Sequence, residues 1–216
     1  MRSILGITER REREKKQRKN DIVDAAERVF FKKGHEYATM DDVANEAELS
    51  KGTLYLYFKN KEDLYLAIHL RGNKILHTLF KQAVQKEKSG IKKTRSIGNA
   101  YVEFFKKYPD YFNAMLYYES RDIDYSDQDS VAVECLVEGK STIDLLINSI
   151  KMGIEDGSIR PSIDPVKTAL CLWGQTTGIL QIASLKEKSI LSKHFSTSAQ
   201  ELIDYNFDLI YNTLKA

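Results

Sequence analysis

Residues Thr39 to Leu64 read TMDDVANEAELSKGTLYLYFKNKEDL, and the fold follows from this stretch. Asp42 stands three residues after Thr39, which is the spacing of a capping box at the start of a helix. After a tight connection, Ser50 is placed to cap a second short helix, predicted over 51–57. Two short helices joined by a turn of three to four residues form a helix-turn-helix.

The residues before this motif predict one more helix, over 21–33. Apolar side chains recur there one turn apart, at Ile22, Ala25, Ala26, Val29 and Phe30. Gly34 can adopt the left-handed conformation that ends a helix. The inner sides of the three helices therefore share one small core.

The rest of the 216 residues predicts further helices, because apolar residues keep helical spacing and there are only 3 Pro and 11 Gly. A long helix is expected from Asn60 to about Val84, and the last one starts near Thr197 or Ser198. The others are expected over 94–108, 109–121, 128–156 and 165–186, the last of these capped by Asp164. We expect an all-α fold with a basic arm or helix extension at 1–19, a helix-turn-helix DNA-binding domain at 20–66 and a larger helical domain at 67–216.

Charge is segregated near the amino terminus. Arg10 to Lys19 holds seven basic and two acidic residues, whereas Asn20 to Ser50 holds three basic and eight acidic residues. Such a basic run is typical of a segment that meets phosphates, but a solvated tail has the same composition. The run alone does not decide between the two interpretations.

The motif resembles the helix-turn-helix of the TetR family of bacterial regulators. The residues that agree at fixed offsets are Thr39, Val43, Ala44, Ala47, Ser50, Gly52, Tyr55, Tyr57, Phe58 and Lys61, and the resemblance covers about 22–68. Glu48 departs from the pattern, since the family usually has Gly there, where a positive φ is easiest, so the turn is expected to be slightly strained. The segment GSIRPSIDPVKTALCLWGQTTGIL is also similar to the penultimate helix of the family and the residues that lead into it.

The helix over 51–57 is predicted to present one face to DNA. With Leu54 and Phe58 pointing inward, Gly52 and Leu56 point outward, and they could approach base edges together with Thr53. The remaining hydroxyl and ammonium groups suit phosphates, although the tyrosine rings could equally pack on the first helix and the lysines could lie on a solvated face. The predicted DNA contacts are Thr39, Ser50, Lys51, Gly52, Thr53, Tyr55, Leu56, Tyr57 and Lys61.

No catalytic or metal-binding pattern stands out. His69 and His77 are eight residues apart, more than two helical turns, and neither His35 nor His194 pairs with them. The acidic loop 122–129 lacks the turn glycine and the bidentate glutamate of a calcium loop. We expect no enzyme, no metal and no cofactor; a helical adaptor that binds only protein is the remaining competitor.

The sequence predicts a cytoplasmic protein. Cys135 and Cys171 stand far apart without the spacing of a zinc site or a disulfide framework, which fits a reducing compartment. The most apolar of the long stretches, 168–185, is interrupted by polar residues, and the amino terminus lacks an apolar signal segment. We expect neither export nor a membrane span.

The carboxyl-terminal part is rich in aromatic residues, most of which belong to a core. The family resemblance implies an effector cavity there, and the candidates for its lining are Phe105, Phe112, Met115, Tyr118, Trp173 and Thr177. Such a lining suits a small, mainly hydrophobic effector. Glu119, Glu134 or Glu138 would favour a cation if one of them faced inward.

The last two helices predict a homodimer. The final helix carries two apolar stripes on nearly opposite sides, and Gly174 and Gly178 permit close approach of another helix. The predicted interface residues are Cys171, Gly174, Gly178, Ile182, Phe207, Ile210, Tyr211 and Leu214, unless both helices are buried inside one monomer. The expected function is a repressor released from a palindromic operator by its effector; an activator or an effector-independent regulator on the same fold is the alternative.

Overall fold

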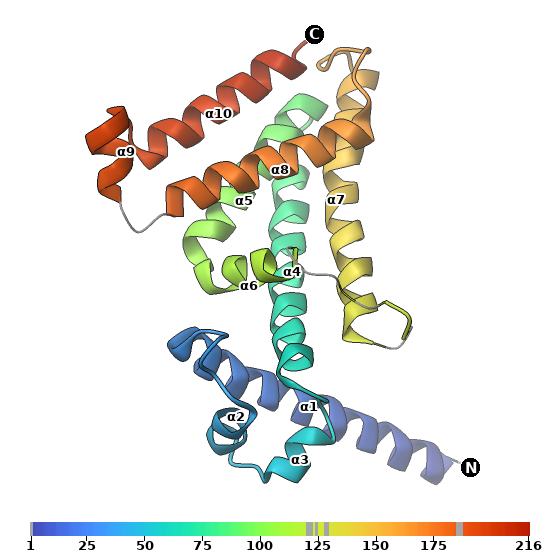
Figure 1. Cartoon of the computed structure of the whole chain (residues 1–216). Coiled ribbons are helices and arrows are strands. Elements are labelled where there is room, and N and C mark those ends of the chain that lie inside the picture. Colours follow the sequence, from blue (N-terminus) through green and yellow to red (C-terminus); the bar gives the residue numbers. More distant parts are fainter. Residues whose placement is uncertain (1, 120–122, 124, 128–129, 185–187) are drawn as a thin grey trace. The chain divides into compact units, whose positions relative to one another are not determined.

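The computed structural model describes residues 2–119, 123, 125–127, 130–184 and 188–216, and it is all-α (Figure 1). Within these ranges the only β-type pairing is an isolated antiparallel bridge between Ile159 and Lys215. The chain forms two compact units. Unit 1 comprises Met1–Gly72 and Asn113–Cys135, and unit 2 comprises Asn73–Phe112 and Leu136–Ala216. The predicted boundaries 1–19, 20–66 and 67–216 stay a prediction.

Unit 1 begins with three helices that share a core, α1 (Arg2–Lys33), α2 (Met40–Glu46) and α3 (Lys51–Tyr55). Their inner side chains are buried: Ile22, Ala25, Ala26, Val29, Phe30, Val43, Leu54 and Phe58. The capping box of α2 is confirmed, because the Asp42 amide donates to Thr39 Oγ1 at 3.1 Å and the Thr39 amide donates to Asp42 Oδ2 at 3.0 Å. The Ser50 cap of α3 is also confirmed, with the Thr53 amide 3.2 Å from Ser50 Oγ.

Two of these helices differ in length from the prediction. The helix expected over 21–33 is only the last part of α1, so the basic run is a helix extension rather than a loose arm. α3 ends at Tyr55, two residues early. The Leu56 and Tyr57 amides bond the carbonyls three residues before them, which tightens the end of the helix into a 3₁₀-type turn.

The beginning of α4 (Lys61–Gln85), the second part of α6 (Pro109–Glu119) and the first residues of α7 (Val131–Glu155) complete unit 1. The predicted cap at Asn60 is confirmed, since its Oδ1 accepts the Asp63 amide at 2.7 Å. Residues 120–122, 124 and 128–129 lie outside the described part of the chain. The end expected at Arg121 and half of the acidic loop 122–129 fall there.

Unit 2 contains the rest of α4, α6 and α7 together with α5 (Gly90–Lys107), α8 (Pro165–Ser184), α9 (Lys188–Phe195) and α10 (Ala199–Leu214). Asp164 caps α8, because its Oδ1 accepts the Val166 and Lys167 amides at 3.0 Å each. Of the two starts predicted for the last helix, Ser198 is the cap, and it forms a capping box with Glu201. The residue Lys186, where the penultimate helix was expected to end, lies outside the described residues.

Contacts with distant residues explain why α5 begins four residues before the predicted 94. The Gly90 amide donates to Asp156 Oδ2 at 2.7 Å, and the Ile91 amide donates to Ser158 Oγ at 3.2 Å. A methyl group at Gly90 would lie 2.0 Å from the Gly153 nitrogen, so only glycine permits this close crossing of α5 and α7. A sequence pattern does not reveal caps that come from a distant turn of the chain.

α9 was not predicted at all. It occupies eight residues between the two last long helices, in a stretch whose apolar residues are too few to give a clear helical period. No helix of the described chain is both long and apolar enough to cross a membrane.

Candidate nucleic-acid interface and apolar pocket

α3 presents the predicted face to solvent. Leu54 and Phe58 are fully buried against α1 and α2, whereas Leu56 at the end of the helix is 82% exposed. Lys51, Gly52 and Tyr55 are exposed, and Thr53 and Tyr57 are half-buried. An exposed leucine of this kind on a short polar helix is suited to an apolar partner such as a thymine methyl group.

The amino-terminal turn of α3 is rigid and open at the same time. Ser50 Oγ and Thr53 Oγ1 lie 2.8 Å apart, so one hydroxyl holds the other at the start of the helix. A methyl group at Gly52 would meet no atom closer than 4.0 Å, which leaves the backbone there accessible. A nucleic-acid backbone or base edge could therefore approach this turn closely.

The two predicted phosphate-binding lysines are not equivalent. Lys51 Nζ forms an ion pair with Asp41 at 2.6 Å, with both side chains exposed, so a phosphate could replace the carboxylate. Lys61 Nζ instead donates to the carbonyl of His35 at 2.9 Å and to that of Glu36 at 3.4 Å. Lys61 thus caps the carbonyls that follow α1, and a DNA contact by this residue stays a prediction.

Glu48 has a φ of 54°, in the left-handed region that L-residues rarely adopt. It is the first residue after Ala47, the C-cap of α2, and the next amide, of Leu49, bonds back to Ala44 at 2.9 Å. The turn expected from the departure at this position is therefore strained at the residue that the sequence indicated. The strain lies inside the helix-turn-helix, between α2 and α3.

Aromatic residues join the second part of α6 to α1 and α4 within unit 1. The Tyr117 ring centroid lies 4.3 Å from that of His35 and 5.3 Å from that of Tyr65. Tyr118 Oη donates a hydrogen bond to the carbonyl of Glu62, in the first turn of α4. Tyr118 and Met115 were expected to line an effector cavity; both are buried and neither lines the pocket described next.

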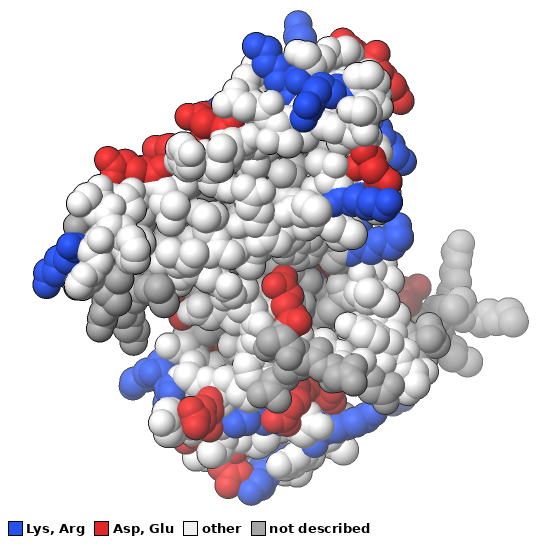
Figure 2. Space-filling model, turned by 45° about the horizontal axis from the view of Figure 1, so that its top comes forward, with Lys and Arg blue, Asp and Glu red and all other residues white. Residues whose placement is uncertain are grey.

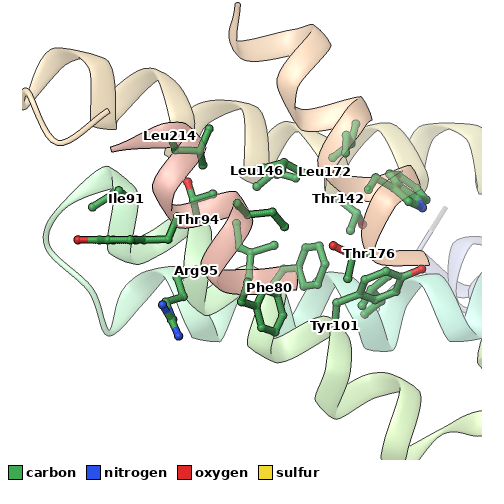
Figure 3. Close-up of a pocket in the computed structure, with 18 residues that line it drawn as sticks. Phe80, Ile91, Thr94, Arg95, Tyr101, Thr142, Leu146, Leu172, Thr176 and Leu214 are labelled. Atoms are coloured by element: carbon green, nitrogen blue, oxygen red, sulfur yellow. The ribbon is translucent and has the colours of Figure 1, made fainter. Parts of the chain in front are cut away.

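An apolar pocket of about 60 Å³ lies in unit 2, between α4, α5, α7, α8 and α10 (Figure 3). Its wall consists almost entirely of aliphatic, aromatic and threonine side chains. The residues that line it are Leu76, Phe80, Ile91, Thr94, Arg95, Ile97, Gly98, Tyr101, Thr142, Ile143, Leu146, Leu172, Trp173, Thr176, Phe207, Ile210, Tyr211 and Leu214. Arg95 is the one charged residue among them, and it lies at the edge of the group in Figure 3.

Of the six predicted lining residues, only Trp173 faces this pocket. Thr177 lies just behind the wall, where its hydroxyl is 2.9 Å from Tyr101 Oη. Phe105 and Phe112 form a ring pair at 5.1 Å, and Phe112 in turn contacts the Tyr101 ring at 5.9 Å. The aromatic richness that suggested a cavity therefore belongs mainly to the core behind it, while α10 and the first half of α5 supply lining residues that were not predicted.

A family model described as bacterial regulatory proteins of the tetR family matches residues 22–68, the part of the chain that forms this helix-turn-helix. The chain belongs to the TetR family. The similarity extends over most of the chain in YhgD of Bacillus subtilis (strain 168), named an uncharacterized HTH-type transcriptional regulator: 29% identity over 164 residues, covering 72% of this chain and 78% of YhgD.

Two further comparisons frame the function of this TetR-family regulator. The HTH-type transcriptional activator FasR of Mycolicibacterium smegmatis is 28% identical over 134 residues, covering 62% of this chain and 59% of FasR. The crystal structure of the regulator FadR from Bacillus subtilis in complex with stearoyl-CoA superimposes with a TM-score of 0.66 at 16% identity, covering 89% of this chain and 97% of that chain. At this identity the structural match shows the fold alone.

The TetR-family regulator exposes an apolar face on α8 and α10. Cys171, Gly174 and Ile182 on α8 are exposed as predicted, and Gly178 is half-buried. Leu170 on α8 and Leu209 on α10 are also exposed, and Tyr205 is 63% exposed. Figure 2 shows a wide area without charged side chains on the side to which these two helices face.

The four interface residues predicted on α10 lie elsewhere. Phe207 and Leu214 are buried, and together with Ile210 and Tyr211 they line the pocket. The sequence shows two apolar stripes of equal helical spacing on this helix, and the stripe predicted for the interface is the one that faces the pocket, so a part of these four residues in dimerisation stays a prediction. The outer stripe contains Tyr205 and Leu209.

In the described part of the chain, no group of three or more His, Cys, Asp or Glu side chains is arranged to hold a metal ion. Neither cysteine forms a disulfide: Cys171 is exposed, and Cys135 is buried, where its Sγ donates to the carbonyl of Leu66 at 3.6 Å.

Proposed function

We propose that this TetR-family regulator is a repressor that binds a palindromic operator as a homodimer and leaves it when a small, mainly hydrophobic effector occupies the pocket of unit 2. The observation that carries the proposal is the course of α4. Leu76 and Phe80 on this helix line the pocket, and its first residues follow directly on the helix-turn-helix. Movement of the pocket wall can thereby reach the DNA-binding core through one continuous helix.

The proposed contacts with DNA divide into two kinds. Gly52, Thr53 and Leu56 at the open turn and outer face of α3 read base edges, because Gly52 and Leu56 are exposed and the half-buried Thr53 lies between them with a short side chain. The remaining candidates hold phosphates and fix the register without reading sequence. These are Thr39, Ser50, Lys51, Tyr55 and Tyr57, and Lys61 only if it leaves the carbonyls that it caps.

The apolar face of α8 and α10 is the proposed dimer interface. Methyl groups at Gly174 and Gly178 would meet no atom of this chain within 4 Å, so a partner helix can approach closely there. Two helices from each subunit would form a four-helix interface with two-fold symmetry. Leu209→Asp should yield monomers in analytical ultracentrifugation, whereas Leu56→Asp, on an equally apolar but distant exposed position, should leave the dimer intact.

The pocket lining defines the chemical class of the effector. No Asp or Glu lines the pocket, and Arg95 stands at its rim, where its guanidinium is 3.9 Å from Asp208. This pair is about half exposed and therefore weak, so the anionic group of a ligand could displace Asp208. We infer an effector with an apolar chain and an anionic group, a class to which the stearoyl-CoA held by FadR also belongs.

The pocket must widen to admit such a chain. Its volume of about 60 Å³ is well below the roughly 150 Å³ of a cavity that accepts benzene. Aromatic side chains of α8 and α10, Trp173, Phe207 and Tyr211, form part of the wall, and their rotation would create the space. An effector that prefers this widened state weakens operator binding by its differential affinity for the two states, and DNA must weaken effector binding by the same factor.

Trp173 provides the test, because it is the only tryptophan of the chain and lines the pocket. Decanoate, decanoyl-CoA, decanol and decyltrimethylammonium share one apolar chain and differ in the charge of the head group. We expect the anionic ligands to change Trp173 fluorescence at the lowest concentration. Arg95→Gln should weaken decanoate binding about tenfold and leave decanol unchanged, whereas Lys92→Gln, on the same helix but outside the pocket, should change neither.

Activation is the second candidate function, and the name of FasR favours it. Repression and activation differ in where the operator stands relative to a promoter. Transcription in vitro from the promoter next to the selected operator distinguishes them: added protein lowers transcript yield for a repressor and raises it for an activator. An effector-independent regulator would show the same yield with and without each ligand.

A further inference from the structure

Before its packed part, α1 contains an arm of about three helical turns that is made only of polar residues. Residues 9–20 read ERREREKKQRKN, and all are exposed except Lys19, which is half-buried. Burial begins at Ile22. Figure 1 shows this arm running beyond α2 and α3. A helix without an apolar face is not stabilised by tertiary packing, so its stability must come from charge interactions or from a partner.

The positive charges on this arm are arranged on one side. At 100° per residue, Arg11, Lys15, Arg18 and Lys19 fall within an arc of about 100°. Their spacing of four, three and one residues continues the spacing of Ile22, Ala26 and Val29, the buried residues further along α1. The basic face therefore points to the side of α1 on which α2 and α3 pack.

Lys19 shows that this orientation holds in three dimensions. Its Nζ lies 5.7 Å from the ring centroid of Phe58, the buried residue just after α3. The basic face thus begins at the helix-turn-helix itself and extends outward from it. Any duplex that lies along α3 has the same side of the arm turned toward it.

The four basic side chains of this face form no ion pair among the described residues, whereas Arg10, on a different side, pairs with Glu14 at 2.8 Å. Arg11 and Lys15 are one helical turn apart, as are Lys15 and Lys19, so each pair repels and destabilises the isolated helix. A polyanion that runs parallel to the face removes this repulsion. Residues 9–20 themselves contain no apolar side chain that could insert into a membrane.

We propose that this arm is an additional DNA-binding element that contacts duplex phosphates outside the half-site read by α3. The inference rests on the proposed function, since it needs a bound operator. The arm of residues 9–20 is about 18 Å long at 1.5 Å per residue, which corresponds to about five base pairs at 3.4 Å each. Each protomer of the dimer then protects about five further base pairs at the outer end of its half-site.

The test compares two triple variants with the same change of charge. Arg11→Gln/Lys15→Gln/Arg18→Gln neutralises the basic face but keeps Lys19, which contacts the core. Arg10→Gln/Arg13→Gln/Lys16→Gln removes two arginines and one lysine from the other sides of the same arm. Both are measured by hydroxyl-radical footprinting on a selected operator and by the salt dependence of operator affinity, with circular dichroism to verify helix content.

The face variant should lose about five base pairs of protection at each end of the footprint. It should also lower the slope of log affinity against log salt by about 5, that is, 0.9 for each of six lost phosphate contacts per dimer. The other triple variant should keep the full footprint and most of the slope. Equal slopes and identical footprints for the two variants would overturn the inference, since the arm would then act only by its net charge. Absence of any protected sequence with the unmodified protein would contradict the proposed function itself.

Discussion

The hydroxyl of Tyr118 donates a hydrogen bond to the backbone carbonyl of Glu62, and this bond joins the second part of α6 to the first turn of α4. Burial raises the pKa of the Tyr118 hydroxyl, so the group stays protonated and acts as a donor throughout the physiological range. Glu62 follows the helix-turn-helix directly. Within unit 1, the second part of α6 is thereby tied to the core that carries α3.

Tyr118→Phe keeps the ring contacts with Tyr65 and His69 and removes only this bond. We expect the free energy of unfolding to fall by about 0.5–1.5 kcal/mol, the usual net value of a hydrogen bond. Urea denaturation measures it. Tyr205→Phe, which removes the same group from an exposed position on α10, should leave stability unchanged; an equal loss in both variants would contradict the importance of the Glu62 contact.

His69 makes stability depend on pH. It is half-buried in unit 1 with its ring Nδ1 shielded from solvent, and this loss of solvation lowers its pKa from 6.5 to about 4. Between these two pH values the unfolded chain binds a proton at His69 and the folded chain does not. The free energy of unfolding is therefore unaffected by His69 above pH 6.5 and decreases as the pH falls toward 4.

His69→Gln should reduce the loss of unfolding free energy between pH 7 and pH 5 by on the order of 2 kcal/mol, since each pKa unit is worth about 1.4 kcal/mol. Urea denaturation at the two pH values provides the measurement. His194→Gln, at an exposed position, is the control and should retain the pH dependence of the parent. If His69→Gln retained it as well, protonation of His69 would not be its source.

Glu48 stores backbone strain that glycine would relieve. Its φ of 54° costs an L-residue roughly 1–2 kcal/mol, while glycine adds about 0.5–1 kcal/mol of conformational entropy to the unfolded chain. Glu48→Gly should therefore raise the free energy of unfolding by up to about 1.5 kcal/mol. Glu48→Ala removes the charge but keeps the strain, so thermal denaturation should rank the glycine variant above the alanine variant; the reverse order would contradict this account of the turn.

Gly98 controls the size of the pocket. A methyl group there would lie 2.6 Å from Phe207 Cε1, so the ring must move, and it lines the pocket. We expect Gly98→Ala to lower stability by roughly 1–3 kcal/mol, as overpacking does, and to abolish the Trp173 fluorescence response to decanoate. Gly139→Ala, in α7 with nothing within 4 Å, should be neutral or stabilising and keep the response. A normal response in Gly98→Ala would indicate that ligands bind elsewhere.

Much of unit 1 could be predicted from local sequence, because the residues that cap its helices are adjacent in sequence to the helix starts. Thr39 with Asp42, Ser50 and Asn60 are all confirmed as caps, and the inward direction of Leu54 and Phe58 follows from helical geometry alone. The outward direction of Leu56 follows in the same way. These features need no knowledge of the rest of the chain.

Unit 2 was less predictable, because its pocket depends on which of two apolar faces each helix turns inward. Phe207 and Tyr205 belong to stripes of equal helical spacing on α10, yet the first lines the pocket and the second is exposed. The place of Arg95 at the pocket could not be predicted from the sequence either, since one arginine on a basic helix has the pattern of an ordinary surface charge. Tertiary packing decides such cases.

The central claim is that α3 reads a two-fold symmetric DNA sequence. Selection from a random duplex library, followed by footprinting with the purified protein, tests it most directly. We expect one palindromic or nearly palindromic sequence, protected in major grooves about 34–36 Å apart or a multiple of this. Thr53→Ala should change the base preference at one position of each half-site, with a change in discrimination free energy of roughly 1–3 kcal/mol. Lys51→Ala should weaken binding to all sequences by the same factor. Selection of no sequence, or of an asymmetric one whose preferences survive Thr53→Ala and Leu56→Ala unchanged, would contradict the claim.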